Sequence, residues 1–189
     1  VVVYGHGGEQ VKQSLPSFNI SWVEQAEQLG TGHAVQQASG GITTDDTVLI
    51  LYGDVPLINQ STLHKMIDAC DEKTMSLLTV DLTEPTGYGR IVRSNGDVEK
   101  IVEQKDASDE QLLISEVNTG ILALKGALLK NCLSALKNDN AQQEYYLTDV
   151  IEMAVNKGIR IDTIQPANEF EVQGVNSSSQ LNQLERFQQ

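Results

Sequence analysis

Short apolar runs alternate with amphipathic segments along this 189-residue chain, and the alternation predicts repeated strand and helix units. Strands are predicted at residues 1–6, 19–25, 47–52, 74–82, 115–125, 159–165 and 169–173. Helices are predicted at residues 9–15, 33–38, 127–136 and 145–156, with one more that Ser61 caps and a last one that Asn176 caps. This order favours an α/β fold, a doubly wound, mostly parallel sheet covered by helices on both faces.

The pattern changes between residues 90 and 103. Residues 90–93 and 97–103 alternate in polarity around Ser94-Asn95-Gly96, and Asn-Gly is a strong hairpin signal. We therefore expect an antiparallel hairpin inserted into the mostly parallel sheet. Neither an internal repeat nor a linker is visible, so residues 1–189 are expected to form one domain.

Charge and apolar content exclude several classes of protein. The formal net charge is -13 and no block of Lys or Arg occurs, which disfavours nucleic acid and anionic membrane surfaces as partners. No apolar run is long enough to span a bilayer, and no signal-peptide pattern opens the chain. Cys70 and Cys132 lie in helical patterns and suggest buried thiols in a reducing compartment, so a cytoplasmic location is expected.

Asp54 directly follows the apolar run of residues 47–52. Ligands of open α/β sheets bind beyond the carboxyl ends of the strands, so this acid is placed to hold a metal ion or a ribose hydroxyl. The alternative is that Asp54 only caps a turn. A chain this acidic would hold an anionic ligand through a cation, through main-chain N–H groups or through a few placed side chains. That constraint favours Asp54 as a metal ligand.

Three further segments carry candidate binding groups. Gln25 precedes the turn Gly30-Thr31-Gly32, where an amide and free main-chain groups could read a base edge; an ordinary strand–turn–helix joint capped by Thr31 is the alternative. The loop at 85–90 contains two glycines and leads to Glu103, which could accept hydrogen bonds from sugar hydroxyls or simply be solvated. Asn118 interrupts an apolar strand, so its amide needs either a ligand or neighbouring main chain as a partner.

The remaining polar positions are less specific. The acids of residues 144–149 would stabilise a helix N-terminus whatever the function. Asn176 offers an oxygen that could complete a magnesium site with Asp54. The histidines have neither zinc-site spacing nor a nucleophile nearby and are assigned no catalytic role: His6, His33 and His64.

Seven segments stand in a characteristic order: Gln-Ala-Glu-Gln-Leu-Gly-Thr-Gly-His-Ala at 25–34, Tyr-Gly-Asp-Val-Pro-Leu at 52–57, Pro-Thr-Gly-Tyr-Gly-Arg-Ile at 85–91, Ile-Val-Glu-Gln-Lys-Asp-Ala at 101–107, Glu-Val-Asn-Thr-Gly at 116–120, Glu-Tyr-Tyr-Leu-Thr-Asp at 144–149 and Glu-Val-Gln-Gly-Val-Asn at 171–176. Together they resemble the uridyltransferase domain of the bacterial bifunctional N-acetylglucosamine-1-phosphate uridyltransferase and glucosamine-1-phosphate acetyltransferase family. The resemblance implies a nucleotide-diphospho-sugar transferase fold. It also implies transfer of a uridylyl group from UTP to N-acetylglucosamine 1-phosphate, which gives UDP-N-acetylglucosamine for peptidoglycan and lipopolysaccharide synthesis.

The resemblance also implies roles for individual residues. The uracil would be contacted by Gln25, Gly30 and Thr31, and the sugar and phosphates would lie beside Tyr52, Gly53 and Asp54. The N-acetylglucosamine moiety would be held by Gly89, Glu103 and Asn118, with Tyr146 and Thr148 near its phosphate or acetamide. Magnesium would be held by Asp54 and Asn176.

The chain departs from the family pattern at both ends. The family opens with a strand and a triphosphate loop, Leu-Ala-Ala-Gly-x-Gly-Thr-Arg-Met, followed by a lysine after a proline, and residues 1–189 contain neither. We therefore expect the first strand–helix unit, with its catalytic Arg and Lys, to be missing before Val1. The hexapeptide repeats of the acetyltransferase β-helix, through which the family forms homotrimers, are absent from these residues as well.

Two alternatives stay open. A metal-dependent nucleotide-sugar glycosyltransferase would share the sheet and the metal, although it typically carries Asp-x-Asp where this chain has Asp54-Val55-Pro56. A non-catalytic fragment that keeps part of a sugar-nucleotide pocket is the other. A dinucleotide oxidoreductase is disfavoured, because residues 5–8 do not supply Gly-x-Gly-x-x-Gly.

We expect residues 1–189 alone to be inactive in uridylyl transfer, because they lack the loop that would cradle the triphosphate. The purified chain is to be incubated with UTP, N-acetylglucosamine 1-phosphate and Mg²⁺, and pyrophosphate release measured. Release above the enzyme-free background would contradict this expectation.

Overall fold

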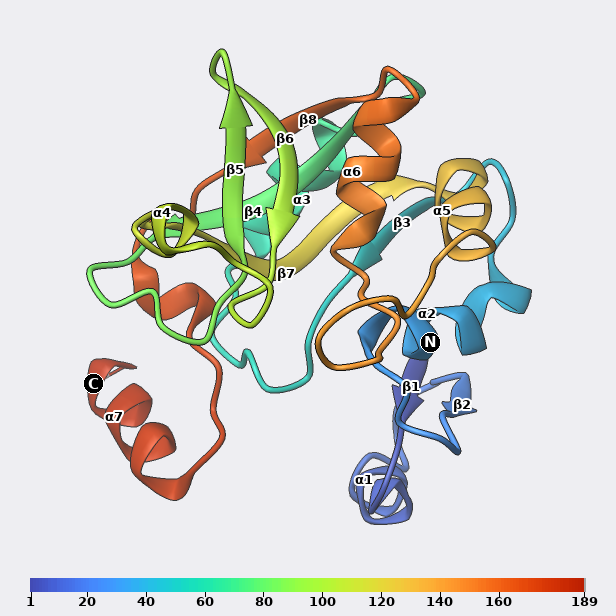
Figure 1. Ribbon diagram of the computed structural model, residues 1–189. Helices are drawn as coiled ribbons and strands as arrows, with labels where there is room; N and C mark the ends of the chain where they lie inside the picture. Colours follow the sequence, from blue (N-terminus) through green and yellow to red (C-terminus); the bar gives the residue numbers. More distant parts are fainter. Residues whose placement is uncertain (189) are drawn as a thin grey trace.

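The computed structural model describes residues 1–188, which form a six-stranded mixed sheet, a separate two-stranded sheet and helices on both sides (Figure 1). The strands are β1 (Val2–Tyr4), β2 (Trp22–Glu24), β3 (Thr47–Ile50), β4 (Thr74–Asp81), β5 (Arg90–Ser94), β6 (Asp97–Val102), β7 (Glu116–Lys125) and β8 (Arg160–Ile164). The α-helices are α1 (Gly8–Ser14), α2 (Thr31–Ala38), α3 (Gln60–Asp68), α4 (Asp109–Leu112), α5 (Gly126–Leu133), α6 (Asp149–Asn156) and α7 (Ser178–Gln188). No described helix is long and apolar enough to cross a membrane.

The main sheet has the order β6-β5-β7-β4-β8, and β3 also pairs with β7. Because β3, β4 and β5 are antiparallel to β7 and β8 is parallel to β4, four strands share one direction, whereas β6 and β7 run against it. The predicted α/β class, with a mostly parallel sheet and an inserted hairpin, is confirmed. The sequence did not predict that β7 runs antiparallel to its neighbours in the sheet. The β5–β6 hairpin reverses the direction of the chain, and β7 runs in the same direction as β6.

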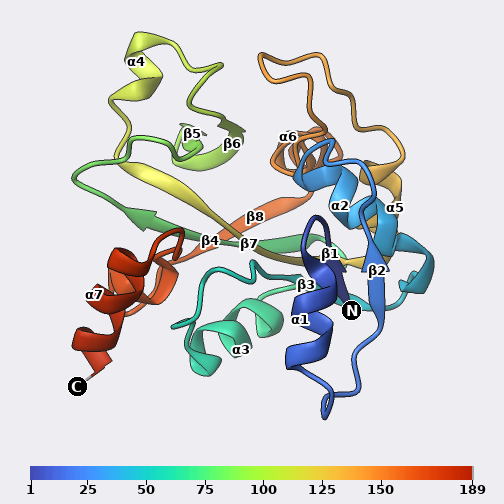
Figure 2. The ribbon, with the colours of Figure 1, turned by 90° about the horizontal axis from the view of Figure 1, so that it is seen from below.

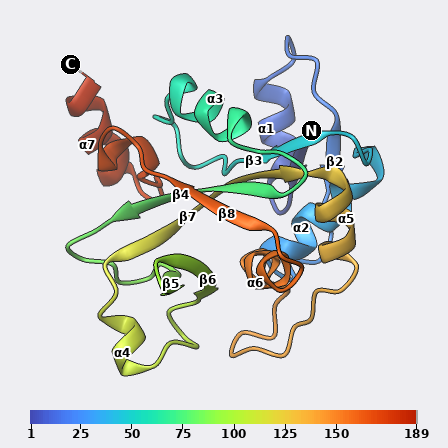
Figure 3. The same cartoon turned by 90° about the horizontal axis from the view of Figure 1, so that it is seen from above.

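Helices cover both faces of the sheet, and each face has its own core. Figures 2 and 3 show α2, α5 and α6 on one side and α1, α3 and α7 on the other. One core joins the sheet to the hairpin, α5 and α6 through side chains such as Leu77, Leu122 and Ile151. The other joins the sheet to α3 and includes Met66, Leu78 and Ile121. Residues of β4 and β7 therefore alternate between two buried faces, which explains their continuous apolar runs.

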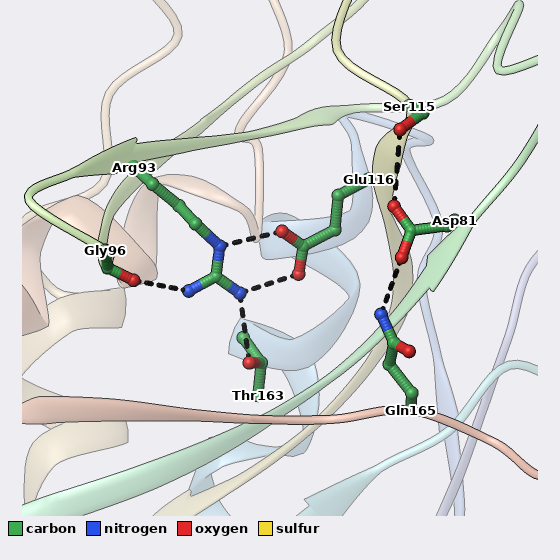
Figure 4. Close-up of polar contacts among 7 residues, drawn as sticks. All are labelled: Asp81, Arg93, Gly96, Ser115, Glu116, Thr163 and Gln165. Carbon is green, nitrogen blue, oxygen red and sulfur yellow. Dashed lines mark hydrogen bonds and ion pairs between the residues drawn. The ribbon is translucent and has the colours of Figure 1, made fainter.

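The hairpin β5–β6 turns at Asn95 and Gly96, both with positive φ (52° and 93°), as its Asn-Gly pair predicts. Arg93 fixes the hairpin to the sheet through a bidentate pair with Glu116 at 2.7 Å, and also donates to Gly96 O and Thr163 Oγ1 (Figure 4). Beside this group, the Asp81 carboxylate accepts from Ser115 and Gln165. Side-chain hydrogen bonds thus connect neighbouring strands β5, β7, β4 and the end of β8.

Two predicted caps are wrong. Helix α3 begins at Gln60 because the Asn59 side chain accepts from the Ser61 N–H at 2.9 Å, which makes Asn59 the N-cap instead of Ser61. Helix α7 begins at Ser178, and the Ser177 hydroxyl accepts from the Gln180 N–H. The Asn176 side chain is therefore not the cap of this helix.

Two predicted elements differ as well. Residues 145–148 are not helical, because the main chain of Tyr145 bonds to the Gly30 turn and the helix starts only at Asp149. The predicted strand at 169–173 is a 3-10 helix, Glu169–Val172. There the buried Glu171 carboxylate accepts from Ala167 N and Thr62 Oγ1, bonds that turn the chain inward.

Strands β1 and β2 pair only with each other among the described residues. A mainly apolar cavity of about 850 Å³ is lined on one side by residues 1–3 and on another by residues 47–53. β3 bonds to β7 along one edge, so its other edge faces this cavity.

Leu122 tests the core on which the sheet depends. Its side chain is 1% exposed between the sheet and the helices, so Leu122→Ala leaves a cavity and should lower the free energy of unfolding by about 3 kcal/mol. Leu113 is 85% exposed, and the control Leu113→Ala should change it by less than about 0.5 kcal/mol. Urea unfolding measures both; equal effects would contradict this core assignment.

Candidate functional site

An irregularity in β7 organises the candidate site. The register between β4 and β7 shifts between the pairs Leu77–Leu122 and Thr79–Asn118, so β7 has extra residues there. Gly120 adopts φ 83°, a conformation that favours glycine. The side chains of Asn118-Thr119 replace the missing ladder bonds: Asn118 Oδ1 accepts from Gly120 N at 2.9 Å, and Thr119 Oγ1 donates to Leu78 O at 2.7 Å. The short polar sequence therefore builds the bulge.

Asn118 obtains its partner from neighbouring main chain, the second of the two possibilities that its position left open. Because Oδ1 is bound to the Gly120 N–H, the amide orientation is fixed and Nδ2 remains as a donor. The main-chain N–H of Asn118 donates to Gly89 O at 2.9 Å. Two of the expected sugar-binding residues therefore lie side by side.

Glu103 lies on the other side of Gly89. A Cβ added at Gly89 would be 3.4 Å from Glu103 Oε2, and Thr148 Oγ1 donates to Glu103 Oε1 at 2.9 Å. Burial raises the pKa of Glu103, the Thr148 bond opposes that rise, and Asp106 adds to it. Tyr146 is 7% exposed and donates from its hydroxyl to Asp106. The irregular main chain before α6 thus brings Tyr146 and Thr148 next to the segment that follows the hairpin.

Tyr52 links the bulge to the glycine turn. A Cβ at Gly120 would lie 2.4 Å from the Tyr52 ring, so the ring packs directly on the bulge. The Tyr52 hydroxyl bonds to the Thr31 side chain, and burial raises its pKa. The next residue, Gly53, has open space where a side chain would be.

The glycine turn is clamped to the segment before α6. Tyr145 N donates to Leu29 O at 2.8 Å, Gly32 N donates to Tyr145 O at 2.7 Å, and Leu147 N donates to Thr31 Oγ1 at 3.1 Å. Thr31 therefore does not cap its own helix through its side chain. These bonds hold the turn at residues 29–32 against the segment that carries Tyr146 and Thr148.

Gln25 reaches into this turn from the end of β2. Its Nε2 donates to Gly30 O at 3.0 Å and lies 3.0 Å from His33 Nδ1. The sequence predicts no catalytic role for His33, yet its ring contacts the side chain of Gln25, which is predicted to bind the base. Its position three residues after Gly30, on the first turn of α2, is the signal that could have found it.

Asp54 and Asn176 approach each other across 122 residues of sequence. A Cβ placed on Gly174 would lie 3.3 Å from Asp54 Oδ2 and 3.9 Å from Asn176 Nδ2. Val175 N also donates to Asp54 O at 2.8 Å, which fastens the two segments together. Both side chains are exposed at this edge, and rotation of the Asn176 amide would present Oδ1 in place of Nδ2. Within residues 1–188, no three His, Cys, Asp or Glu side chains form a metal-binding group.

These contacts join the expected residues into two neighbouring sets. One is a continuous chain of contacts that comprises Gln25, Gly30, Thr31, Tyr52, Asn118, Gly89, Glu103 and Thr148. The other is the pair Asp54 and Asn176, which follows Tyr52 along the chain. Both sets lie beyond strand ends and bulges, where α/β proteins bind ligands.

Comparison with known proteins defines the class. Residues 6–168 match the nucleotidyl transferase family, so the chain belongs to that family. Solved structures share the fold at low identity. A Methanothermobacter nucleotidyl transferase matches at a TM-score of 0.63 and 17% identity, covering 99% of this chain and 72% of the other.

Two further structures give the same picture. A Bacillus anthracis protein described as a glucose-1-phosphate thymidylyltransferase, in complex with sucrose, has a TM-score of 0.68 and 16% identity over 98% of this chain and 74% of its own. UDP-glucose pyrophosphorylase in complex with UDP-glucose has a TM-score of 0.71 and 16% identity over 98% and 78%. The chain is therefore a nucleotidyltransferase by family and shares its fold with proteins whose names refer to sugar phosphates and nucleotide sugars.

The site contains one strongly perturbed acid that the sequence did not single out. Burial, then the charges of Glu152, Glu103 and Asp106, raise the pKa of Asp149 from 3.8 to about 6. Because the folded pKa exceeds the unfolded one, the native state binds more protons between these values. Stability therefore declines as pH rises from about 4 to about 6.

Asp149→Asn removes this decline. We expect the variant to exceed the wild type in unfolding free energy at pH 7 by on the order of 1 kcal/mol, after allowance for partial exposure, and to lose that advantage at pH 4.5. Urea unfolding at both values measures it, with Asp139→Asn on an exposed loop as the control. An advantage of Asp149→Asn that is independent of pH would show that the titration of Asp149 is not its cause.

Proposed function

We propose that this chain is the uridyltransferase part of an enzyme that makes UDP-N-acetylglucosamine and pyrophosphate from UTP and N-acetylglucosamine 1-phosphate. The observation that carries the proposal is the continuous set of contacts from Gln25 to Glu103, with Asp54 and Asn176 beside it. The seven sequence segments that resemble the bacterial bifunctional uridyltransferase family all contribute residues to this region. The match to the nucleotidyl transferase family supports nucleotidyl transfer. The solved neighbours include proteins named for thymidylyl transfer to glucose 1-phosphate and for UDP-glucose.

The base end of this set offers groups suited to a pyrimidine. Gln25 supplies an amide, and the N–H groups of Gly30, just before α2, and of Thr31, its first residue, have no hydrogen bond in the described structure. Hydrogen bonds to Tyr145 hold the turn in place, and they leave the N–H groups of Gly30 and Thr31 as donors for one edge of a flat base.

The sugar end combines one acceptor with one donor. Glu103 offers a half-buried carboxylate and Asn118 offers Nδ2, on either side of Gly89. An acetamido group needs an acceptor for its N–H and a donor for its carbonyl, and sugar hydroxyls use both. Tyr146 and Thr148 extend this surface toward the position proposed for the phosphate or acetamide.

Magnesium fits the pair Asp54 and Asn176. A carboxylate and an amide oxygen from two segments are hard ligands, and Mg²⁺ completes its shell with water and phosphate oxygens. When bound, the ion would neutralise phosphate charge at the reacting centre. No Lys or Arg side chain is among the residues assigned to this site, so the chain's own contribution is to hold both substrates at fixed positions.

The reaction joins a phosphate oxygen of the sugar phosphate to the α-phosphorus of UTP, and the bond from that phosphorus to pyrophosphate breaks. Such a displacement needs alignment and charge neutralisation more than a covalent nucleophile. Gln25 with the Gly30 turn would hold the uridine, and Glu103 with Asn118 would hold the sugar. The main-chain bonds of Tyr145 fasten this turn to the segment whose Thr148 side chain donates to Glu103.

We also propose the cellular setting that follows from this activity. The product would feed peptidoglycan and lipopolysaccharide precursors in the cytoplasm. The parent protein would carry a further acetyltransferase domain and form a homotrimer through it. Neither nucleic acid nor a membrane is a proposed partner, which agrees with a formal net charge of -13.

Calorimetry of UDP-N-acetylglucosamine binding tests the proposal. We expect binding that Mg²⁺ strengthens, and Asp54→Asn should abolish this strengthening, an effect of about tenfold or more, while leaving metal-free binding unchanged. The control Asp45→Asn changes an exposed acid on the loop before β3 and should behave as the wild type.

Other outcomes separate the alternatives. Absence of heat with every UDP-sugar would contradict the proposed function and favour a remnant without a ligand. Binding accompanied by consumption of UDP-N-acetylglucosamine in the presence of acceptor sugars would favour a glycosyltransferase, since the proposed enzyme makes that compound.

A further inference from the structure

One side chain ties the loop of residues 87–89 to the segment that follows the hairpin. Gln104 Oε1 accepts from Gly87 N at 3.1 Å and from Arg90 Nη2 at 2.9 Å. Both partners can only donate, so the atom that faces them is the carbonyl oxygen, and the orientation of the Gln104 amide is fixed. The Gln104 side chain is half-buried and directly follows Glu103 in the chain.

Arg90 holds the same loop from inside the protein. It is 2% exposed, and its Nη1 donates to Tyr88 O. Within residues 1–188 the guanidinium has no carboxylate partner and donates to two neutral oxygens, those of Tyr88 and Gln104. Hydrogen bonds from a charged donor are stronger than neutral ones, and a buried cation that loses an acceptor is left poorly satisfied. Gln104 therefore joins the loop to a buried cation that has few other acceptors.

The loop carries a main-chain donor at the proposed sugar end of the site. Gly89 N donates no hydrogen bond to any described residue, whereas Gly89 O accepts from Asn118 N at 2.9 Å. A Cβ added at Gly89 would lie 2.8 Å from Ile101 Cγ2 and 3.4 Å from Glu103 Oε2, so the loop passes close to both side chains. The bonds of Gln104 therefore help to set where the free N–H of Gly89 lies relative to the Glu103 carboxylate.

We propose that Gln104 is a positioning residue that holds the loop of residues 87–89 beside Glu103 and so sets the affinity for the N-acetylglucosamine part of a nucleotide sugar. The inference rests on the proposed function, which assigns the sugar to this end of the site. Gln104 makes no hydrogen bond to the turn at residues 29–32, so the affinity for the nucleotide part should not depend on it. A comparison of UDP-N-acetylglucosamine with UDP therefore separates the two contributions.

Calorimetry with these two ligands in the presence of Mg²⁺ tests the inference. The wild type should bind the nucleotide sugar about tenfold more tightly than UDP, or better, because the sugar adds hydrogen bonds. Gln104→Met keeps the length of the side chain but lacks the acceptor, so this affinity ratio should fall about three- to tenfold while the affinity for UDP stays unchanged. Gln104→Glu places an acceptor oxygen at the same position and should restore the ratio. The control Gln13→Met changes an exposed residue of α1 and should leave the ratio unchanged.

Hydrogen exchange of the Gly87 amide reports the bond to Gln104 without any ligand. Loss of the acceptor should speed this exchange about tenfold in Gln104→Met, whereas Gln104→Glu should keep the wild-type rate. An unchanged rate in Gln104→Met would overturn the inference, because other groups would then hold the loop.

Thermal unfolding should show that every variant is folded, since Gln104 is only half-buried. An unfolded Gln104→Met, equal weakening of both ligands, or no weakening of either would leave Gln104 without a positioning role, and the proposed function would stand. Equal affinity of the wild type for UDP and UDP-N-acetylglucosamine would instead contradict the sugar end of the proposed function. Failure of both ligands to bind would contradict that function as a whole, and in either of these cases the inference falls with it.

Discussion

The bulge in β7 is the constraint on which the candidate site depends. Asn118, Thr119 and Gly120 exchange regular ladder bonds for side-chain bonds, and the positive φ of Gly120 lets Tyr52 pack against the strand. A regular strand would point Asn118 elsewhere and would push Tyr52 away from Thr31. Local polar bonds therefore replace the regular ladder in this largely buried strand and fix the shape of the candidate site.

Main-chain bonds, more than side-chain pairs, hold the parts of the site together. The turn at residues 29–32 is fastened to Tyr145, Gly89 to Asn118, and Asp54 to Val175. Side chains near these joints then remain available: Glu103 keeps one carboxylate oxygen beyond its Thr148 bond, and Asn118 keeps Nδ2. Burial raises the pKa of Asp149, and the nearby charges of Glu152, Glu103 and Asp106 add to the rise, so the end of the site near α6 disfavours a further negative charge.

Much of the fold was predictable from the sequence because its signals are local. Continuous apolar runs gave the positions of β4 and β7, and Asn95-Gly96 gave the hairpin turn. The failures have tertiary causes. The helix expected from Tyr145 starts at Asp149 because Tyr145 bonds to residues more than a hundred positions earlier, and residues 169–172 coil because the buried Glu171 attracts distant donors. The position of candidate site residues at strand ends was readable, whereas the contact of His33 with Gln25 appears only in three dimensions.

Gly30 and Gly32 leave little room for substitution in the turn at residues 29–32. A side chain on Gly30 would come within 2.7 Å of the Tyr145 carbonyl oxygen, and one on Gly32 within 2.6 Å of Leu136 and 2.8 Å of the same oxygen. Substitutions at either glycine would push the turn off its support. Any redesign of this turn would therefore have to leave its backbone intact and change only neighbouring side chains, such as Gln25 and His33.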